Sequence, residues 1–286
     1  MLPEISIEFE GKARSFLKRS ERGIVALIIE ETESAIYELK TSLDIPKTLT
    51  TENKTFIERA FKGSPNKVIV VAVTTEEGIE AGLDILETMK FNYLAFKTTG
   101  LTDNQTVATW IKNQMDNKDN LVKAVLANEA ADHEGIINFT TRNIVVDGEK
   151  VETEDFTSRI AGLLAGLPLT RSATYVVLDE VEDVERLSKD EYDAKIENGE
   201  FVLIHDGEKV KVGRGVNSLT TVELPKTEDF KKILIVDKMH MWKEDIKMTI
   251  ADGYVGRFAN TYDNKCLLIT DIRLYNKRLA GQGILD

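Results

Sequence analysis

Short apolar runs alternate with amphipathic stretches along the first half of the chain. Four of the runs are brief, which predicts strands at residues 22–30, 67–73, 91–97 and 121–127. The run at 67–73 (KVIVVAV) has no polar alternation, as expected for a strand covered on both faces of a parallel sheet. Strands joined through helices by short connections favour right-handed crossovers. The predicted fold class is therefore α/β, with a mainly parallel sheet core flanked by helices.

Helical spacing of apolar residues fills the intervals between these strands. Residues 53–61 form one such stretch, a second carries Ile79, Leu83 and Leu86, and a third carries Val107, Trp110 and Ile111. A Thr or Ser followed three residues later by Glu or Gln forms a capping box, in which each side chain bonds the other's backbone amide. The pattern predicts capping boxes at Thr74/Glu77, Thr102/Gln105 and Ser188/Glu191.

Shorter elements are predicted around this regular core. Phe156, Ile160, Leu163 and Leu164 mark a helix that ends near Gly166 and Pro168. Further strands are predicted at residues 34–39 (paired with 22–30), 135–139, 143–148 and 176–184.

The C-terminal part changes from this alternation to a hairpin and two long helices. Residues 201–212 are two alternating runs around Asp206-Gly207, a dipeptide that suits a tight hairpin turn. Helical spacing then runs from Thr227 to about Ile250, and a second helix runs from about Asn260 to Leu279. A Gly-containing break at residues 252–257 separates the two.

The N-terminus predicts an arm. Ile5, Ile7 and Phe9 alternate with polar residues, as in a strand with one apolar face, and a basic tether follows them. This strand belongs either to the chain's own sheet or to the sheet of a neighbour. We therefore divide the chain into an arm and linker (1–20), an α/β body (21–199) and a C-terminal part (200–286).

Charge and composition exclude several classes of protein. The net charge of −12 argues against a general nucleic-acid binder, since neutralising phosphates requires clustered Lys and Arg. No apolar run reaches the roughly 20 residues of a membrane span. The single Cys266 excludes a disulfide framework.

The charge is unevenly distributed along the chain. From residue 226 onward Lys and Arg outnumber Asp and Glu by 11 to 9, whereas the rest holds 26 against 40. Two differently solvated faces explain this split, and so does a basic surface turned toward an acidic partner. On the second interpretation, Lys231, Lys238 and Lys243 are the candidate contact residues.

The chemistry-bearing residues do not converge on a recognisable active site. Gly213-x-Gly215-x-x-Ser218 resembles a dinucleotide fingerprint but lacks its third Gly and the helix that must follow at once. His133, His205 and His240 are widely separated, without metal-ligand spacing. Acidic residues from Glu180 to Glu185 are typical of a solvated surface. We therefore expect no catalytic centre, no cofactor and no metal.

Three segments resemble the C-terminal part of contractile-tail sheath proteins, found in myophages and phage-tail-like bacteriocins. They are 214–220 (RGVNSLT), 254–257 (YVGR) and 275–279 (YNKRL), and the Gly-rich helix end at 161–175 looks like sheath sequence as well. None is a catalytic motif. The alternative hypothesis, an α/β enzyme or small-molecule binder with an unrecognised site, explains only the α/β core.

The resemblance implies a structural role in a helical polymer. Subunits of such a sheath stack as rings around an inner tube, and each lends terminal strands, here carrying Ile5, Ile7 and Phe9, to its neighbours. Further implied partners are the inner tube protein, the baseplate and the tail terminator, with no nucleic acid and no membrane insertion. Assembly in the host bacterial cytoplasm and a place in a virion tail or tail-like particle are implied as well.

The sequence departs from the family at its end, where sheath proteins usually continue into a C-terminal arm. This chain ends at residues 283–286 (GILD). Because both arms are needed to close the mesh, we expect this chain alone to form a monomer or small oligomer rather than long polymers.

Overall fold

The computed structural model describes residues 22–100 and 102–285 and divides into two compact units. The larger unit comprises residues 21–237, and residues 238–285 belong to the smaller one. The division falls within helix α6 (Ile233–Thr249). The sequence instead placed the start of a C-terminal part at residue 200, yet strand β10 (Glu200–Phe201) pairs with the central sheet of the larger unit. The three-part division remains a prediction.

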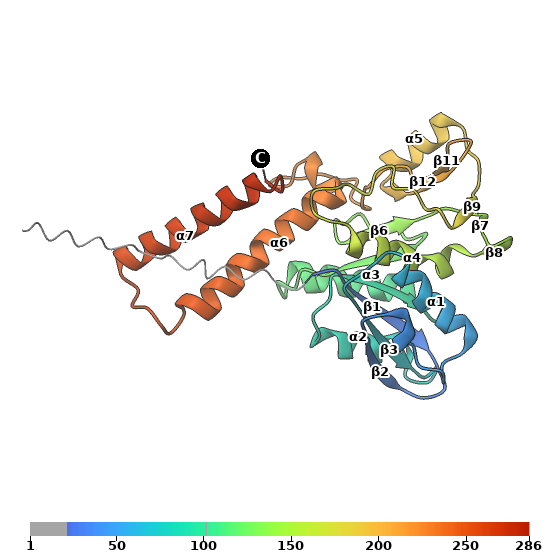
Figure 1. Cartoon of the computed structure of the whole chain (residues 1–286), viewed down its shortest axis with the longest axis horizontal. Coiled ribbons are helices and arrows are strands. Elements are labelled where there is room, and N and C mark those ends of the chain that lie inside the picture. Colours follow the sequence, from blue (N-terminus) through green and yellow to red (C-terminus); the bar gives the residue numbers. More distant parts are fainter. Residues whose placement is uncertain (1–21, 101, 286) are drawn as a thin grey trace, which may run out of the picture. The chain divides into compact units, whose positions relative to one another are not determined.

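A seven-stranded sheet organises the larger unit (Figure 1). Its order is β10-β6-β5-β4-β1-β3-β2, and every pairing is parallel except that of β2 with β3. The strands not yet delimited are β1 (Ile24–Glu30), β2 (Ala35–Leu39), β3 (Lys67–Val73), β4 (Tyr93–Lys97), β5 (Lys123–Ala127) and β6 (Ile136–Phe139). The predicted α/β class with a mainly parallel sheet is confirmed.

The expected pairing of residues 34–39 with residues 22–30 is wrong. Strand β2 pairs antiparallel with β3, with Ile36 opposite Val71. β1 has no free edge, because β3 and β4 pair with its two sides in parallel. The chain leaving β1 therefore reaches the outer edge of β3.

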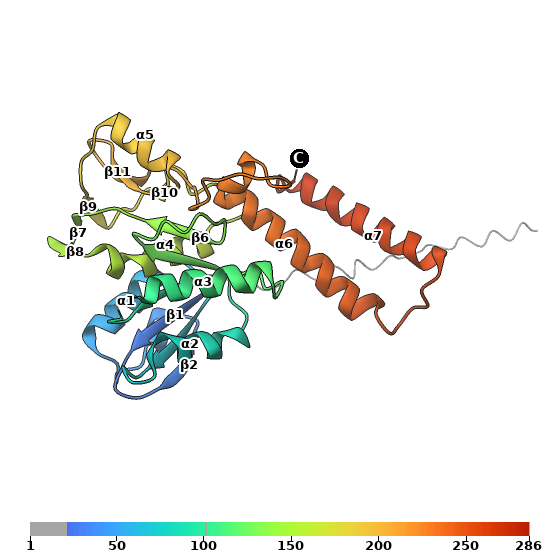
Figure 2. The same ribbon diagram turned by 180° about the vertical axis from the view of Figure 1, so that it is seen from behind.

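Helices cover both faces of the sheet. α1 and α4 pack against one face and α2 and α3 against the other, and Figure 2 shows α3 on the side turned toward the viewer. Their bounds are α1 (Thr51–Phe61), α2 (Gly78–Glu87), α3 (Asp103–Asp116) and α4 (Thr153–Gly166). Alternate residues of each strand enter the two apolar layers: Val25 and Leu27 face α1 and α4, while Ala26 and Ile28 face α2 and α3. Burial of both faces explains the continuous apolar runs.

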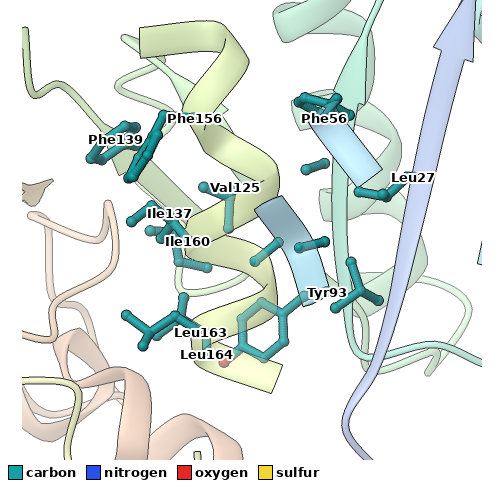
Figure 3. Packing of buried hydrophobic residues seen from close by; sticks show 14 of the residues in the cluster. Leu27, Phe56, Tyr93, Val125, Ile137, Phe139, Phe156, Ile160, Leu163 and Leu164 are labelled. Atoms are coloured by element: carbon teal, nitrogen blue, oxygen red, sulfur yellow. The ribbon is translucent and has the colours of Figure 1, made fainter. Parts of the chain in front are cut away.

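The layer under α4 is the larger of the two. Figure 3 shows Ile160 of α4 beside Ile137 and Val125 of the sheet, with Phe156 next to Phe139. The rings of Phe139 and Phe156 are 6.2 Å apart between centroids, within the range of favourable aromatic pairs. The sheet is thereby held on this side by aliphatic and aromatic packing together.

Two small sheets complete the larger unit. One contains β7 (Ile144–Val146), β8 (Glu149–Val151) and β9 (Val181–Asp183), and the other contains β11 (Leu203–His205) and β12 (Val210–Val212). The predicted strand 176–184 is interrupted, because a turn at residues 179–180 separates β9 from Val177, which bridges to Lys211 instead.

The hairpin predicted over residues 201–212 is shorter than expected. Phe201 pairs with β6 of the large sheet, so the hairpin begins at Leu203. Its turn spans Asp206 to Lys209, with a φ of +107° at Gly207. The Asp206 side chain accepts the amide of Lys209 at 2.8 Å and so closes the turn from within.

The three predicted capping boxes have different outcomes. Ser188 and Glu191 bond each other's backbone amides at the start of α5 (Lys189–Glu197), as predicted. Thr74 and Glu77 form the same reciprocal bonds, at 3.1 and 3.3 Å, within a turn just before α2. The box at Thr102 is wrong: Thr102 makes no side-chain cap and has a ψ of 4°, whereas a capping residue needs extended backbone.

The smaller unit is a helical hairpin. α6 continues to Thr249, a single π-helical turn follows at Ile250–Tyr254, and α7 (Tyr262–Gly281) returns beside α6. Within residues 22–100 and 102–285, no helix combines the length and apolarity that a membrane crossing requires.

Candidate functional site

The glycine-containing segment 213–218 uses its backbone amides within the chain. The amide of Asn217 donates to Lys231 O at 3.0 Å, and that of Ser218 donates to Ile136 O at 2.8 Å. A pyrophosphate site needs amides that point outward at the start of a helix. The resemblance to a dinucleotide fingerprint thus has no counterpart in the geometry of this segment.

Asn217 and Ser218 are buried and fully engaged. Asn217 Nδ2 donates to Phe230 O at 2.6 Å, and its Oδ1 accepts the amide of Leu219 at 3.1 Å. Ser218 Oγ donates to His133 O at 3.0 Å and accepts the amide of His133 at 3.2 Å. These two polar side chains tie the segment to two other parts of the larger unit.

Asp132 extends this connection at the surface. Its Oδ1 accepts the amides of Thr220 and Thr221 at 2.6 and 2.9 Å and the Thr220 hydroxyl at 3.1 Å. Partial burial opposes ionisation of Asp132, but the hydrogen bonds from Thr221 and Thr220 outweigh it and hold the pKa of this carboxyl well below its usual range. We call residues 217–221, with loop 128–135 that they bind, the brace.

The other two resemblance segments link the helices of the smaller unit. Tyr275, at 1% exposure, donates its hydroxyl to the buried carboxylate of Asp245 on α6. Tyr254 donates to Asp271 Oδ2 on α7 at 2.6 Å, and partial burial together with this carboxylate raises the pKa of Tyr254 to about 12. The YVGR and YNKRL segments therefore each supply a tyrosine that holds the hairpin together.

The predicted helix from residue 227 to residue 250 is interrupted. A 3-10 turn (Glu228–Lys231) precedes Lys232, whose backbone is extended, and α6 begins only at Ile233. Lys232 bridges to Val216, and the Ile233 amide donates to Gly215 O at 3.1 Å. Pairing with the glycine-containing segment outweighs the local helical preference here.

The three candidate lysines lie in different settings. Lys231 lies in the 3-10 turn and pairs with Glu228 at 2.9 Å, while Lys238 and Lys243 lie on α6. Lys238 is half-buried and Lys243 is exposed. At about 100° per residue the two project roughly 140° apart around the helix, so they do not share one face. Ile5, Ile7 and Phe9 lie outside the described residues.

The histidines and the cysteine occupy ordinary structural positions. His133 Nδ1 accepts the amide of Gly135 at 3.0 Å, and His205 Nδ1 accepts that of Gly207 at 2.9 Å. Cys266 is a partly buried free thiol. In the described part of the chain, no three His, Cys, Asp or Glu side chains gather closely enough to hold a metal.

The structure contains a buried ion cluster that the sequence analysis did not predict. Lys123 Nζ lies 2.8 Å from Asp237 Oδ1, Tyr93 donates to Asp237 Oδ2 at 2.7 Å, and Arg22 Nη2 donates to Asp237 O at 3.1 Å. Burial, and then the Asp237 carboxylate, raise the pKa of Tyr93 well above its usual range. The available signal was Lys123, a charged residue in the middle of the strand predicted at residues 121–127.

Comparison with known proteins settles the family. The model of the phage tail sheath protein central domain matches residues 72–218. The tail sheath protein of Clostridium phage phiCD119 is 41% identical over 293 residues, which cover all of this chain and 82% of that relative. The chain belongs to the phage tail sheath family. It is accordingly a structural subunit, as the three resemblance segments indicated.

Solved sheath structures share the fold at low sequence identity. The sheath tail protein of Desulfitobacterium hafniense aligns with a TM-score of 0.82 and 17% identity, over 97% of this chain and 89% of that one. A chain of the anti-feeding prophage helical sheath in the contracted state aligns with a TM-score of 0.75 and 16% identity, over 99% of this chain and 84% of that one. The structural similarity to sheath proteins therefore includes residues of both units.

Proposed function

We propose that the protein polymerises around an inner tube and drives that tube through its target when the polymer contracts. The observation that carries this proposal is the extent of the likeness: 99% of the chain aligns with a subunit of a contracted helical sheath. A chain of the anti-feeding prophage baseplate also has this fold, with a TM-score of 0.72, which favours the baseplate as a second partner. The tail terminator completes the proposed set of partners.

The larger unit is suited to move as a body during contraction. Helices cover both faces of its sheet, and the brace and the ion cluster connect segments far apart in the sequence. A close-packed interior of this kind resists gradual deformation. Movement during contraction is therefore expected at the interfaces between subunits, which change between discrete arrangements. The work of contraction then comes from new contacts between subunits, without a nucleotide or any catalytic turnover.

Adjacent subunits are joined, on this proposal, by strands that pair across the interface. The arm with Ile5, Ile7 and Phe9 supplies one such strand. An end strand of a sheet presents backbone donors and acceptors that a strand from a neighbour can pair with. β2 and β10 are the end strands of the large sheet.

Lys231, Lys238 and Lys243 are the candidates for the tube-facing role, and because Lys238 and Lys243 lie on different faces of α6, only one of these two faces the tube directly. The basic balance of residues 226–286 against the acidic remainder supports this assignment. Lys243 is the strongest of the three, because it is exposed on α6. Lys231 forms an ion pair with Glu228 at 2.9 Å.

The test is co-expression with a tube protein and baseplate proteins of a contractile tail, followed by tube purification and negative-stain microscopy. We expect the protein to co-purify with the tube as a component of the virion tail or tail-like particle. A protein that stays in the host cytoplasm, never binds the tube, and shows saturable turnover abolished by a point mutation would contradict the proposal.

A further inference from the structure

A pocket of about 260 Å³ with both polar and apolar walls lies in the larger unit, at the ends where β1 and β4 begin. Its wall includes the C-terminal end of α4 and the segment that follows it, residues 164–169. The polar side chains that line it are those of Arg22, Ser64, Asn66, Asn92, Tyr93 and Asp237. Arg22 and Asp237 are the charged residues among them, so the electrostatic character of the pocket depends on these two.

The backbone around Arg22 is fixed before any ligand arrives. Asn66 Nδ2 donates to Arg22 O, and the Asn66 amide donates to Gly23 O at 2.8 Å. Asn92 Oδ1 accepts the amide of Ile24 at 3.0 Å. Gly23 has a φ of +77°, and a Cβ there would lie 3.0 Å from Ala165 O, so the tight approach to α4 requires glycine. A site held this rigidly loses little entropy when it binds.

The guanidinium of Arg22 has N–H groups that lack an acceptor within the described residues. Nη2 donates to the backbone oxygen of Asp237 at 3.1 Å. Nε and Nη1 are buried, and no acceptor among the described residues reaches either of them. Buried donors, above all charged ones, almost always have an acceptor in proteins. The pocket beside Arg22 is the space from which such an acceptor can come.

The local charge also favours an anion. Both carboxylate oxygens of Asp237 are already engaged, one by Lys123 and one by Tyr93. Tyr93 stays neutral because its pKa lies well above the usual range. An anion beside Arg22 would thus meet a guanidinium whose Nε and Nη1 are not reached by any carboxylate among the described residues.

We propose that this pocket receives a carboxylate side chain from a second copy of the chain. A carboxylate supplies the missing acceptor, and Arg pairs with this group more strongly than with neutral acceptors. The remainder of the chain outside residues 226–286 carries 40 acidic residues against 26 basic ones, so a neighbouring copy has carboxylates to offer. This occupant rests on the proposed polymer, whereas the affinity of the pocket for oxyanions does not.

The first experiment tests the pocket in the unassembled full chain. The Nε–Hε resonance of Arg22 is assigned by comparison with Arg22→Gln and followed by NMR during titration with acetate, and separately with phosphate. We expect a saturable shift with acetate. The same titration of the exposed Arg142 resonance, assigned with Arg142→Gln, is the matched control. If neither anion shifts the Arg22 resonance more than that of Arg142, the pocket is no anion site and the proposal fails.

The second experiment identifies the source of the carboxylate. Arg22→Lys protein is prepared as ¹⁴N and ¹⁵N chains, which are mixed and assembled with the tube. The assembly is then treated with a carbodiimide, which joins Lys directly to a carboxylate. We expect an isopeptide between Lys at position 22 and an Asp or Glu of the other isotope, at least tenfold more abundant than for Arg142→Lys. Thermal unfolding of both variants checks that they are folded.

The outcomes separate the two proposals. A link confined to Asp237 of the same chain, or a shift with phosphate alone, overturns the second copy as occupant. Failure of the wild-type protein to bind the tube counts against the proposed function instead, and leaves the acetate titration to decide the chemistry of the pocket.

Discussion

Single residues matter most in this protein where charge is buried. Lys123 is 1% exposed in a strand of an apolar sheet, and its partner Asp237 comes from the first part of α6. Two such charges leave water at a large cost in free energy, which their mutual attraction and hydrogen bonds offset only while both are present. Removal of one partner and removal of both should therefore differ sharply.

Asp237→Ala should lower the free energy of unfolding by about 3–5 kcal/mol, because the Lys123 charge stays buried without its carboxylate. The double variant Lys123→Met/Asp237→Leu should recover much of this loss, since neither charge of this ion pair remains. Urea unfolding of the single and double variants, followed by circular dichroism, measures both effects. A double variant that is less stable than Asp237→Ala would contradict this account of the pair.

Asp132 in the brace predicts a pH dependence. Its pKa is lowered in the folded protein, so its contribution to stability is complete above the unfolded pKa of about 3.9 and is lost as the pH falls through the folded value. Asp132→Asn should therefore be less stable than the wild type at pH 6, and the difference should shrink toward pH 3. Because Asp132 is exposed, solvent screening keeps the effect small.

The measurement for Asp132 is a series of thermal unfolding curves between pH 3 and pH 7. Asp193→Asn, on the exposed side of α5, is the control and should follow the wild-type profile. A constant difference between Asp132→Asn and the wild type at every pH would mean that the lost charge is not the cause.

At the scale of elements, α1 and α4 approach each other closely through glycines. A Cβ added to Gly162 in α4 would lie 2.0 Å from Ala60 O, and one added to Gly63 would lie 2.0 Å from the backbone of Gly162. The Ser158 hydroxyl donates to Phe56 O at 2.7 Å across the same contact. Backbone on both sides leaves no flexible atom that can move aside.

Gly162→Ala should consequently force the two helices apart and cost about 3 kcal/mol or more in the free energy of unfolding. Gly281→Ala is the matched control, because Gly281 is also helical and a Cβ there meets nothing within 4 Å. That variant should stay within about 1 kcal/mol of the wild type, on the stabilising side. Equal behaviour of the two variants in urea unfolding would contradict the close packing of α1 on α4.

At the scale of the whole molecule, the charge is divided along the chain rather than balanced locally. The basic excess from residue 226 onward includes the candidate lysines, and the remainder is strongly acidic. Charges farther apart than roughly 10 Å are screened at ordinary salt, so only lysines in contact with the tube affect its binding.

Lys231→Glu combined with Lys243→Glu should weaken the association of sheath with tube, and more strongly at low salt than at high salt. Lys189→Glu, on the exposed start of α5, is the control with one reversed charge away from the proposed surface. Co-sedimentation with the tube at two salt concentrations makes the comparison. Undiminished binding of the double variant at low salt would remove these lysines from the proposed interface.

The sequence by itself determined those features that depend on neighbouring residues. The run at 67–73 is a strand and residues 53–61 belong to a helix, because period and residue type act over a few positions. The Ser188/Glu191 box forms because both of its partners lie within one helical turn. The sheath family was recognisable for a similar reason, since its segments are contiguous.

Only the tertiary structure decided the features that join distant segments. The pairing of β2 with β3, the interruption at Lys232 and the brace each depend on a partner that local pattern cannot specify. Tyr93 and Asp237 are 144 positions apart, yet they share one hydrogen bond in the ion cluster. Burial makes such contacts decisive, because a buried polar group must find its partner wherever in the chain that partner lies.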